Sequence, residues 1–159
     1  GIRDSVASRG LGDVYKRQLQ ADPSLLRTFI EESLRLRAPT QGLSTRLTSQ
    51  EERFGEVNVP RGSVLHLRWA AANIDPEEFE CPMDLQLDRK AASRHLAFSA
   101  GPRVCPGAGI SRLEQQIAWT RLLERLESMS YGSDNTLLHQ PGIMLGTLQL
   151  NLELVKAAK

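Results

Sequence analysis

The sequence predicts a mixed α+β fold that is mainly helical and carries small antiparallel sheets. Residues 22–37 and 110–128 have apolar side chains at helical spacing, whereas residues 43–69 and 148–154 contain short runs typical of strands. The 159 residues are 40% hydrophobic and 25% charged, which is ordinary for one modest globular core. The net charge of +1 argues against a nucleic-acid-binding protein, which normally gathers a basic excess on one face.

Residues 1–18 stand apart from the rest of the chain. They offer no periodic apolar face, and they resemble translated sequencing-adapter read-through from an environmental sequence assembly. The alternative is a polar, flexible native tail. In either case we expect the interpretable chain to begin near Leu19 and residues 19–159 to form one unit.

The first predicted helix begins at Asp22-Pro23, which combines a capping side chain with proline at the first helical position. It runs to about residue 37, because Pro39 stops it. Its apolar stripe consists of Leu25, Leu26, Phe29, Ile30 and Leu34. Glu32 lies beside this stripe and is expected to be partly buried, with Arg35 within reach on the same side, whereas Glu31 is expected to point away.

Two short strand regions follow, Leu43 to Thr48 and Glu56 to Trp69, and together they predict a small antiparallel sheet. The second region is interrupted at residues 60–62, where proline comes early and glycine late, as in a turn. Taken alone, Arg46 would be a solvated charge on an edge strand.

The chain is predicted to end in a helix and a hairpin. A helix to about Ser128 is expected to bury its apolar face, which consists of Ile110, Leu113, Ile117, Leu122 and Leu126. A bend at Gly142, before residues 143–145, precedes a strict alternation of leucines with polar residues over 148–154. This alternation indicates a terminal hairpin.

The loop at residues 98–107 reads Phe-Ser-Ala-Gly-Pro-Arg-Val-Cys-Pro-Gly, and its residues indicate metal binding through a cysteine. Its glycines and prolines favour tight turns that bring the backbone close to a flat cofactor. The helix that follows points its free N–H groups back at the loop, which favours a thiolate there. Cys105 is therefore a candidate metal ligand.

Other cysteine chemistries fit less well. Cys81 and Cys105 are the only cysteines and form no C-x-x-C pair, and the three histidines lack zinc-finger spacing, which argues against a structural zinc site. The glycine run at 107–109 is not a dinucleotide-binding pattern, because Arg112 occupies the third glycine position. A cysteine-nucleophile hydrolase using Cys105 and His95 is disfavoured, since the loop offers no obvious oxyanion site.

The loop matches the pattern Phe-x-x-Gly-x-Arg-x-Cys-x-Gly at all five fixed positions and resembles the haem-ligand signature of the cytochrome P-450 (haem-thiolate monooxygenase) superfamily. The resemblance implies the C-terminal third of a bacterial soluble-type member. It also implies that Cys105 is the proximal iron ligand of haem b and that Arg103 pairs with a haem propionate. The implied cofactor-binding residues are Arg46, Phe98, Gly101, Arg103, Cys105, Pro106 and Gly107. Ser99 departs from the many relatives that have glycine there.

The resemblance assigns further roles away from the loop. It implies a structural triad of Glu32, Arg35 and Arg89 that locks the meander at residues 73–89, although Glu-x-x-Arg alone is most often a solvated pair. It implies that Arg112 is an exposed contact for a redox partner, for which a solvated arginine is the alternative. It also implies a substrate pocket that includes Gly42, Leu43, Ser44, Met144 and Leu145, for which an apolar turn packed on the core is the alternative.

The function implied for the full-length protein is insertion of one oxygen atom from dioxygen into a small apolar organic substrate. The electrons would come from a ferredoxin or a flavoprotein reductase. No catalytic residue is expected within this chain, which alone would be inactive. The alternatives are a haem-thiolate peroxygenase or isomerase that needs no redox partner, and a truncated, non-catalytic fragment or interaction domain.

Two distant cysteines, no secretion signal and no apolar stretch long enough to span a bilayer predict a cytoplasmic protein. A membrane anchor in a missing N-terminal part stays open.

Overall fold

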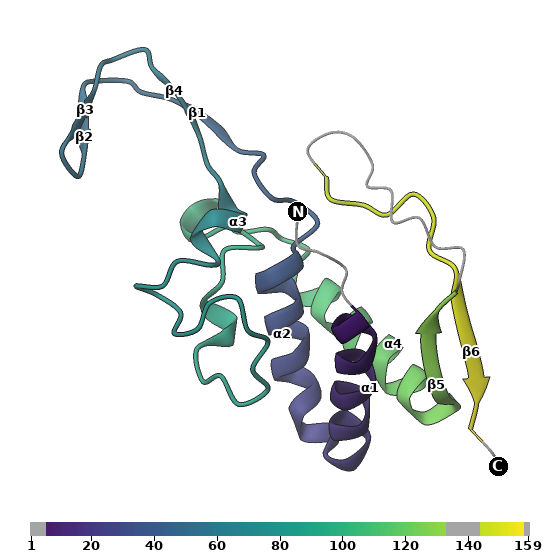
Figure 1. The fold of residues 1–159 in the computed structure, drawn as a ribbon. Coiled ribbons are helices and arrows are strands. Elements are labelled where there is room, and N and C mark those ends of the chain that lie inside the picture. Colours follow the sequence, from purple (N-terminus) through teal and green to yellow (C-terminus); the bar gives the residue numbers. More distant parts are fainter. Residues whose placement is uncertain (1–5, 133–143, 158–159) are drawn as a thin grey trace.

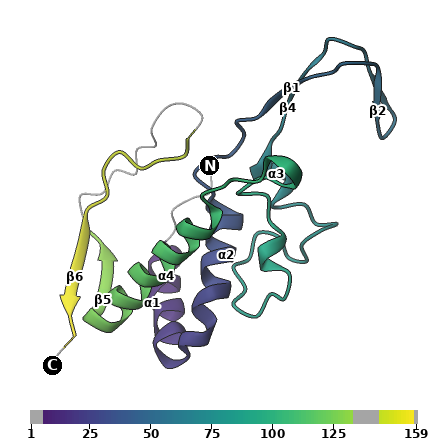
Figure 2. The same cartoon turned by 180° about the vertical axis from the view of Figure 1, so that it is seen from behind.

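A computed structural model describes residues 6–132 and 144–157, with side chains from residue 14 onward. Three helices form its body: α1 (Val6–Ala21), α2 (Leu26–Arg37) and α4 (Ala108–Arg125). They pack side by side in both views of the ribbon (Figures 1 and 2). The mixed α+β class predicted from the sequence is confirmed. Among the described residues, no helix is both long and apolar enough to cross a membrane.

The helical region that ends in α2 starts at the predicted Asp22 cap and stops where its sequence predicts, but residues 23–25 form a 3-10 helix and α2 itself begins at Leu26. The Asp22 carboxylate accepts hydrogen bonds from the Ser24 amide at 3.0 Å and the Ser24 hydroxyl at 2.6 Å. A short 3-10 helix, η1 (Pro23–Leu25), then leads into α2. The helix stops at Arg37 because Ala38, which precedes Pro39, adopts an extended backbone with ψ 134°.

The core lies where α2 meets the other two helices. Leu19, Leu26, Ile30 and Leu34 are buried there, and partly buried neighbours pack against them, among them Phe29, Phe98, Trp119 and Leu123. The rings of Phe29 and Trp119 meet edge to face, with centroids 5.2 Å apart. Most of the predicted stripe of α2 therefore faces this core.

Helix α1 begins at Val6, inside the segment for which the sequence predicted no packed structure. The Tyr15 hydroxyl donates to the carbonyl of Leu85 at 3.0 Å, and the Lys16 ammonium donates to the carbonyl of Glu127. These polar contacts, together with buried Leu19, hold the end of α1 against the rest of the structure. The adapter origin of residues 1–18 stays a prediction.

Two short antiparallel ladders form an arm that projects from the body (Figure 1). Strand β1 (Thr45–Leu47) pairs with β4 (Val64–His66), and β2 (Glu52–Phe54) pairs with β3 (Val57–Val59). The sequence did not predict β2. Between the ladders, the Thr48 hydroxyl donates to the Pro60 carbonyl at 2.7 Å and accepts from the Ser63 amide at 2.9 Å.

The C-terminal part departs from the prediction. Helix α4 ends at Arg125 rather than near Ser128, and β5 (Leu126–Tyr131) follows directly. Strand β6 (Leu152–Lys156) pairs antiparallel with β5, so only the end of the leucine alternation, Leu152 and Leu154, belongs to a ladder, and its partner strand lies about 20 residues earlier. Gly142 and Ile143 lie outside the described residues.

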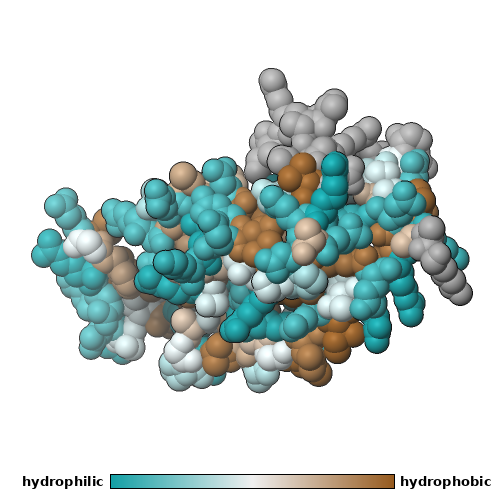
Figure 3. Space-filling model, turned by 90° about the horizontal axis from the view of Figure 1, so that it is seen from below, coloured by the Kyte–Doolittle hydropathy of each residue, from teal (hydrophilic) through white to brown (hydrophobic). Residues whose placement is uncertain are grey.

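The apolar face predicted for α4 is also wrong in part. Ile110, Leu113 and Ile117 are 63%, 56% and 55% exposed, whereas Trp119 and Leu123 pack on the core. Helix α4 rests on α2 through those two side chains, and no described residue buries the Ile110 side. Apolar patches accordingly interrupt the hydrophilic surface (Figure 3).

Candidate metal-binding site

The Cys105 side chain lies exposed on a loop between a 3-10 turn, η3 (Gly101–Arg103), and the start of α4. Its backbone is held on both sides: the Cys105 amide donates to the Phe98 carbonyl at 2.9 Å, and the Cys105 carbonyl accepts from the Ala108 amide at 3.2 Å. Gly101 has φ +66°, a left-handed conformation that glycine adopts without strain. The loop therefore presents its sulfur outward from a fixed backbone.

The residues around Cys105 fit a flat cofactor that brings its own metal. A Cβ added at Gly107 would lie 3.7 Å from the Cys105 sulfur, and one added at Gly101 or Gly109 would meet no atom within 4 Å. Exposed Val104 adds apolar surface to the same loop. Within residues 6–132 and 144–157, no cluster of three or more histidine, cysteine or acidic side chains could hold a bare ion. One thiol is too few ligands for a protein-only metal site, but it would be enough for a metal that a flat cofactor already holds.

The two arginines predicted as propionate partners are both exposed. Arg103 lies at the end of η3, two residues before Cys105. Arg46 lies on β1 and donates to the carbonyl of its neighbour Thr45 at 2.9 Å. Their roles as cofactor contacts stay predictions.

The structure brings Glu32, Arg35 and Arg89 together in the interior. The fully buried Glu32 carboxylate accepts from Arg35 Nε at 2.6 Å and Nη2 at 3.0 Å, and Arg89 Nε lies 3.0 Å from its second oxygen. The Gln86 amide also donates to it at 3.1 Å. Burial by itself would raise the pKa of the Glu32 carboxyl, but the hydrogen bonds from Arg35 and Gln86, together with the ion pair to Arg89, outweigh it and lower that pKa.

The two guanidiniums of this cluster also hold the meander, which directly follows α3 (Trp69–Ala72). Both stack on the ring of Phe79, at 5.0 Å for Arg35 and 6.0 Å for Arg89. Their remaining N–H groups donate to backbone carbonyls: those of Asn73, Pro82 and Asp84 for Arg35, and those of Glu80, Cys81 and Asp84 for Arg89. The cluster therefore fastens an irregular chain segment to α2.

A second buried cluster centres on Glu31, which the sequence placed facing away from the core. That expectation is wrong, because Glu31 is only 5% exposed and both of its oxygens are engaged. Arg112 donates to them from Nε at 2.6 Å and from Nη2 at 3.0 Å, and His95 Nε2 lies 3.1 Å away. Burial would raise the pKa of Glu31, but the hydrogen bonds from His95 and Arg112 prevail and lower it to about 2.

A single-stripe interpretation of α2 could not find this cluster. The helix is covered by α4 as well as by the meander side, so polar residues beside the apolar stripe are buried too. The one signal in the sequence was the adjacent pair Glu31-Glu32, the two acidic residues of this helix.

His95 and Arg112 each make a further contact besides those to Glu31. His95 Nδ1 accepts from the Ala97 amide at 3.1 Å, so both ring nitrogens are occupied, Nε2 by Glu31. This occupation counts against His95 as a base for Cys105 in a hydrolase. Arg112 is 36% exposed, and its guanidinium lies 4.7 Å from the centroid of the Phe98 ring.

The two segments predicted to line a substrate pocket meet in the structure. Thr40 forms an isolated antiparallel bridge with Met144, and its hydroxyl lies 3.2 Å from the Met144 sulfur. Leu43 and Met144 are each 50% exposed. At Gly42 an added Cβ would lie 3.1 Å from the Leu67 carbonyl oxygen, so the backbone segments around Gly42 and Leu67 approach closely.

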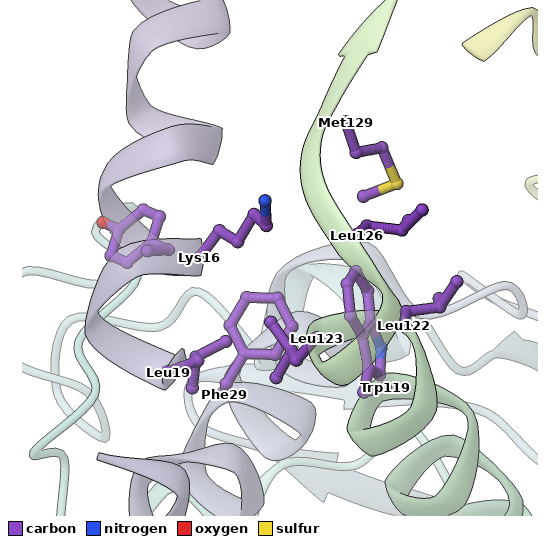
Figure 4. A pocket seen from close by; sticks show the side chains of 9 residues that line it. Lys16, Leu19, Phe29, Trp119, Leu122, Leu123, Leu126 and Met129 are labelled. Carbon is purple, nitrogen blue, oxygen red and sulfur yellow. The ribbon is translucent and has the colours of Figure 1, made fainter. Parts of the chain in front are cut away.

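A separate apolar cavity of about 140 Å³ lies between α1, α4 and β5 (Figure 4). Its walls are Tyr15, Lys16, Leu19, Phe29, Trp119, Leu122, Leu123, Leu126 and Met129. None of the residues predicted to bind a cofactor or substrate lines it.

The comparisons with known proteins agree on one family. The cytochrome P450 family model matches residues 12–154. "Cytochrome P450 107B1" of Saccharopolyspora erythraea is 42% identical over 111 residues, which cover 70% of this chain and 27% of that protein. "Cytochrome P450 144" of Mycobacterium tuberculosis is 39% identical over 110 residues, which cover 69% of this chain and 25% of that protein. The chain thus spans about a quarter of the length of these curated relatives.

Solved structures give the same result. Substrate-free cytochrome P450 CYP150A6 of Mycobacterium marinum superposes with a TM-score of 0.85 at 30% identity, over 92% of this chain and 38% of that one. CYP109E1 of Bacillus megaterium in complex with testosterone gives 0.82 at 27% identity, over 92% and 40%. P450BioI, in complex with an acyl carrier protein ligated to hexadec-9Z-enoic acid, gives 0.79 at 31% identity, over 86% and 35%.

Proposed function

The chain belongs to the cytochrome P450 family, and from this membership we propose that it is part of a longer haem-thiolate monooxygenase with Cys105 as the proximal iron ligand. One observation carries the proposal: the Cys105 thiol is exposed on a loop whose backbone is hydrogen-bonded on both sides of it. A sulfur meant only for packing would be buried among apolar neighbours.

The residues of the loop would hold haem b in distinct ways. Cys105 would bind the iron, and Arg103 would pair with a propionate through its fork of N–H donors. Gly101 and Gly107 leave room for a flat ring beside the sulfur, and Phe98 holds the Cys105 amide through its carbonyl. Thiolate-ligated haem, when bound, supplies the activation of dioxygen and the transfer of one oxygen atom to an organic substrate.

The proposed substrate is a small apolar organic molecule. In support, exposed Leu43 and Met144 belong to segments that meet beside the Thr40–Met144 bridge. Two of the similar structures are complexes, one with testosterone and one with an acyl-ligated carrier protein, and both of these molecules present apolar groups. A ferredoxin or flavoprotein reductase is the proposed electron donor.

The iron ligand can be tested on the complete protein. After chemical reduction under carbon monoxide, the wild type should show the red-shifted absorbance band of a thiolate-ligated haem, and Cys105→Ala should lose it. Cys81→Ala is the matched control, because Cys81 is also exposed but lies in the meander. If Cys105→Ala keeps the band, or Cys81→Ala loses it, the assigned ligand is wrong.

The monooxygenase reaction can be tested separately from ligation. Product formation should need both dioxygen and an electron-donor protein. Turnover with peroxide alone, at a rate that the donor does not increase, would favour the peroxygenase or isomerase alternative instead.

A further inference from the structure

Three segments that are far apart in the sequence meet at the Glu31 carboxylate. Glu31 lies on α2, His95 lies 64 residues later and Arg112, on α4, lies 81 residues later. Arg112 binds both carboxylate oxygens, and His95 shares one of them. The side chains of His95 and Glu31 are 0% and 6% exposed, so water cannot easily replace either partner.

This cluster connects to Cys105 through two short links. The Arg112 guanidinium stacks on the Phe98 ring at 4.7 Å, a distance at which the ring face attracts a cation. The Phe98 carbonyl in turn accepts a hydrogen bond from the Cys105 amide at 2.9 Å. In addition, His95 Nδ1 accepts a hydrogen bond from the Ala97 amide at 3.1 Å. Residues 95–98 are therefore held at both ends. His95 pairs with Glu31, and Phe98 contacts Arg112 and Cys105.

Two other ion pairs that the structure describes are exposed to solvent instead. Arg121 and Glu124, also on α4, form a pair at 3.0 Å whose side chains are 64% and 53% exposed. Arg94 and Glu78 pair at 2.7 Å with 64% and 37% exposure. Exposed pairs of this kind contribute little, whereas removing one partner of a buried pair leaves an uncompensated charge. Moving Arg112 outward to meet another protein would strand Glu31 in the interior.

We propose that Glu31, His95 and Arg112 form a clamp that sets the position of the Cys105 sulfur, so that Arg112 is a positioning residue and not a docking contact for an electron donor. The proposal rests on the function proposed above, because the position of the sulfur matters only if Cys105 binds iron. Phe98 connects the clamp to the Cys105 backbone, because its ring contacts Arg112 and its carbonyl accepts a hydrogen bond from the Cys105 amide.

The test uses Glu31→Gln and Arg112→Lys in the complete protein. Gln removes the charge of Glu31 at nearly constant shape, and Lys keeps the charge of Arg112 but cannot bind two oxygens at once. Each protein is reduced chemically under carbon monoxide, so no electron-donor protein takes part. We expect each variant to convert from the thiolate-type band to the band of a displaced or protonated ligand several-fold faster in mild denaturant than the wild type.

Two further measurements make the test specific to the clamp. The double variant should convert no faster than the faster single variant, because both changes break the same contact. Hydrogen exchange at the Cys105 amide should speed up several-fold in both single variants. The matched controls Glu124→Gln and Arg121→Lys remove an exposed pair from the same helix and should behave as the wild type in both measurements.

The outcomes separate the clamp from its rivals. Conversion rates equal to those of the controls, with only a salt-dependent loss of electron transfer from the donor in Arg112→Lys, would overturn the clamp and make Arg112 a docking contact. If the first variants fail to fold, Phe98→Leu removes the cation–π contact and keeps the backbone bond to Cys105. Faster conversion in this variant would support the clamp, and an unchanged rate would refute it. A wild type without any thiolate-type band would refute the proposed function itself.

Discussion

The strongest quantitative prediction concerns Glu32→Gln. The replacement keeps the size and planarity of the side chain but removes the only negative charge that faces Arg35 and Arg89 in their cluster. The side chains of Arg35 and Arg89 are 0% and 7% exposed, so neither guanidinium can regain its lost partner from water without moving. Two buried positive charges would then share a neutral amide.

The size of the effect follows from the burial of these groups. Removing one partner of a buried ion pair costs about 3–5 kcal/mol. Since a native protein is stable by about 5–15 kcal/mol, this loss is a large part of the whole. With a denaturant slope of roughly 3 kcal/mol per molar urea, the unfolding midpoint should fall by about 1–2 M. The meander should loosen first, because the two guanidiniums hold its carbonyls.

Urea unfolding of the complete protein, followed by circular dichroism, measures this midpoint. Glu124→Gln is the control, because its partner Arg121 is 64% exposed, and it should change stability by no more than about 0.5 kcal/mol. If Glu32→Gln lowers stability by less than about 1 kcal/mol, the two arginines do not depend on the carboxylate, and the cluster is not what fastens the meander to α2.

Two other predictions test local features. Because the pKa of Glu31 is lowered from 4.5 to about 2, its ionised form should stabilise the fold fully above pH 4.5, and this contribution, at most about 3 kcal/mol, should vanish as the pH falls through 2. Acid unfolding of Glu31→Gln should lack this component, and an identical acid transition in wild type and variant would contradict the assignment. Ser99 has φ +64°, so Ser99→Gly should raise the stability of the fold by about 1 kcal/mol, whereas Gly101→Ala, at φ +66° in open space, should lower it by about 1–2 kcal/mol in thermal unfolding. Equal melting temperatures for these two variants would show that the left-handed backbone at this loop carries no strain.

Local signals predicted the elements that depend on local chemistry. The capped start at Asp22, the apolar stripe of α2 and the stop before Pro39 are all confirmed, because a cap, a helical stripe and a proline act within one turn of the chain. The meeting of Glu32, Arg35 and Arg89 was also expected, but from the resemblance to a family and not from spacing, which fits a solvated pair equally well.

Elements that depend on distant partners were missed. Residues 126–128 were predicted to continue the helix but belong to β5, because β6 lies alongside and supplies the ladder. Ile110, Leu113 and Ile117 look like core residues at helical spacing, yet α4 rests on α2 through Trp119 and Leu123. Periodicity shows that a helix has an apolar face but does not show which neighbour covers it.

The sequence by itself determined the turns of the cysteine loop and the candidate ligand that it carries, since glycine, proline and cysteine at fixed positions lie within ten residues. Only the tertiary structure decided which distant residues meet next to that loop. Glu31, His95 and Arg112 are separated by up to 81 positions, and nothing in their spacing indicates that they meet. Packing of α2 against α4 buries the carboxylate, and a buried charge must find partners wherever the fold brings them.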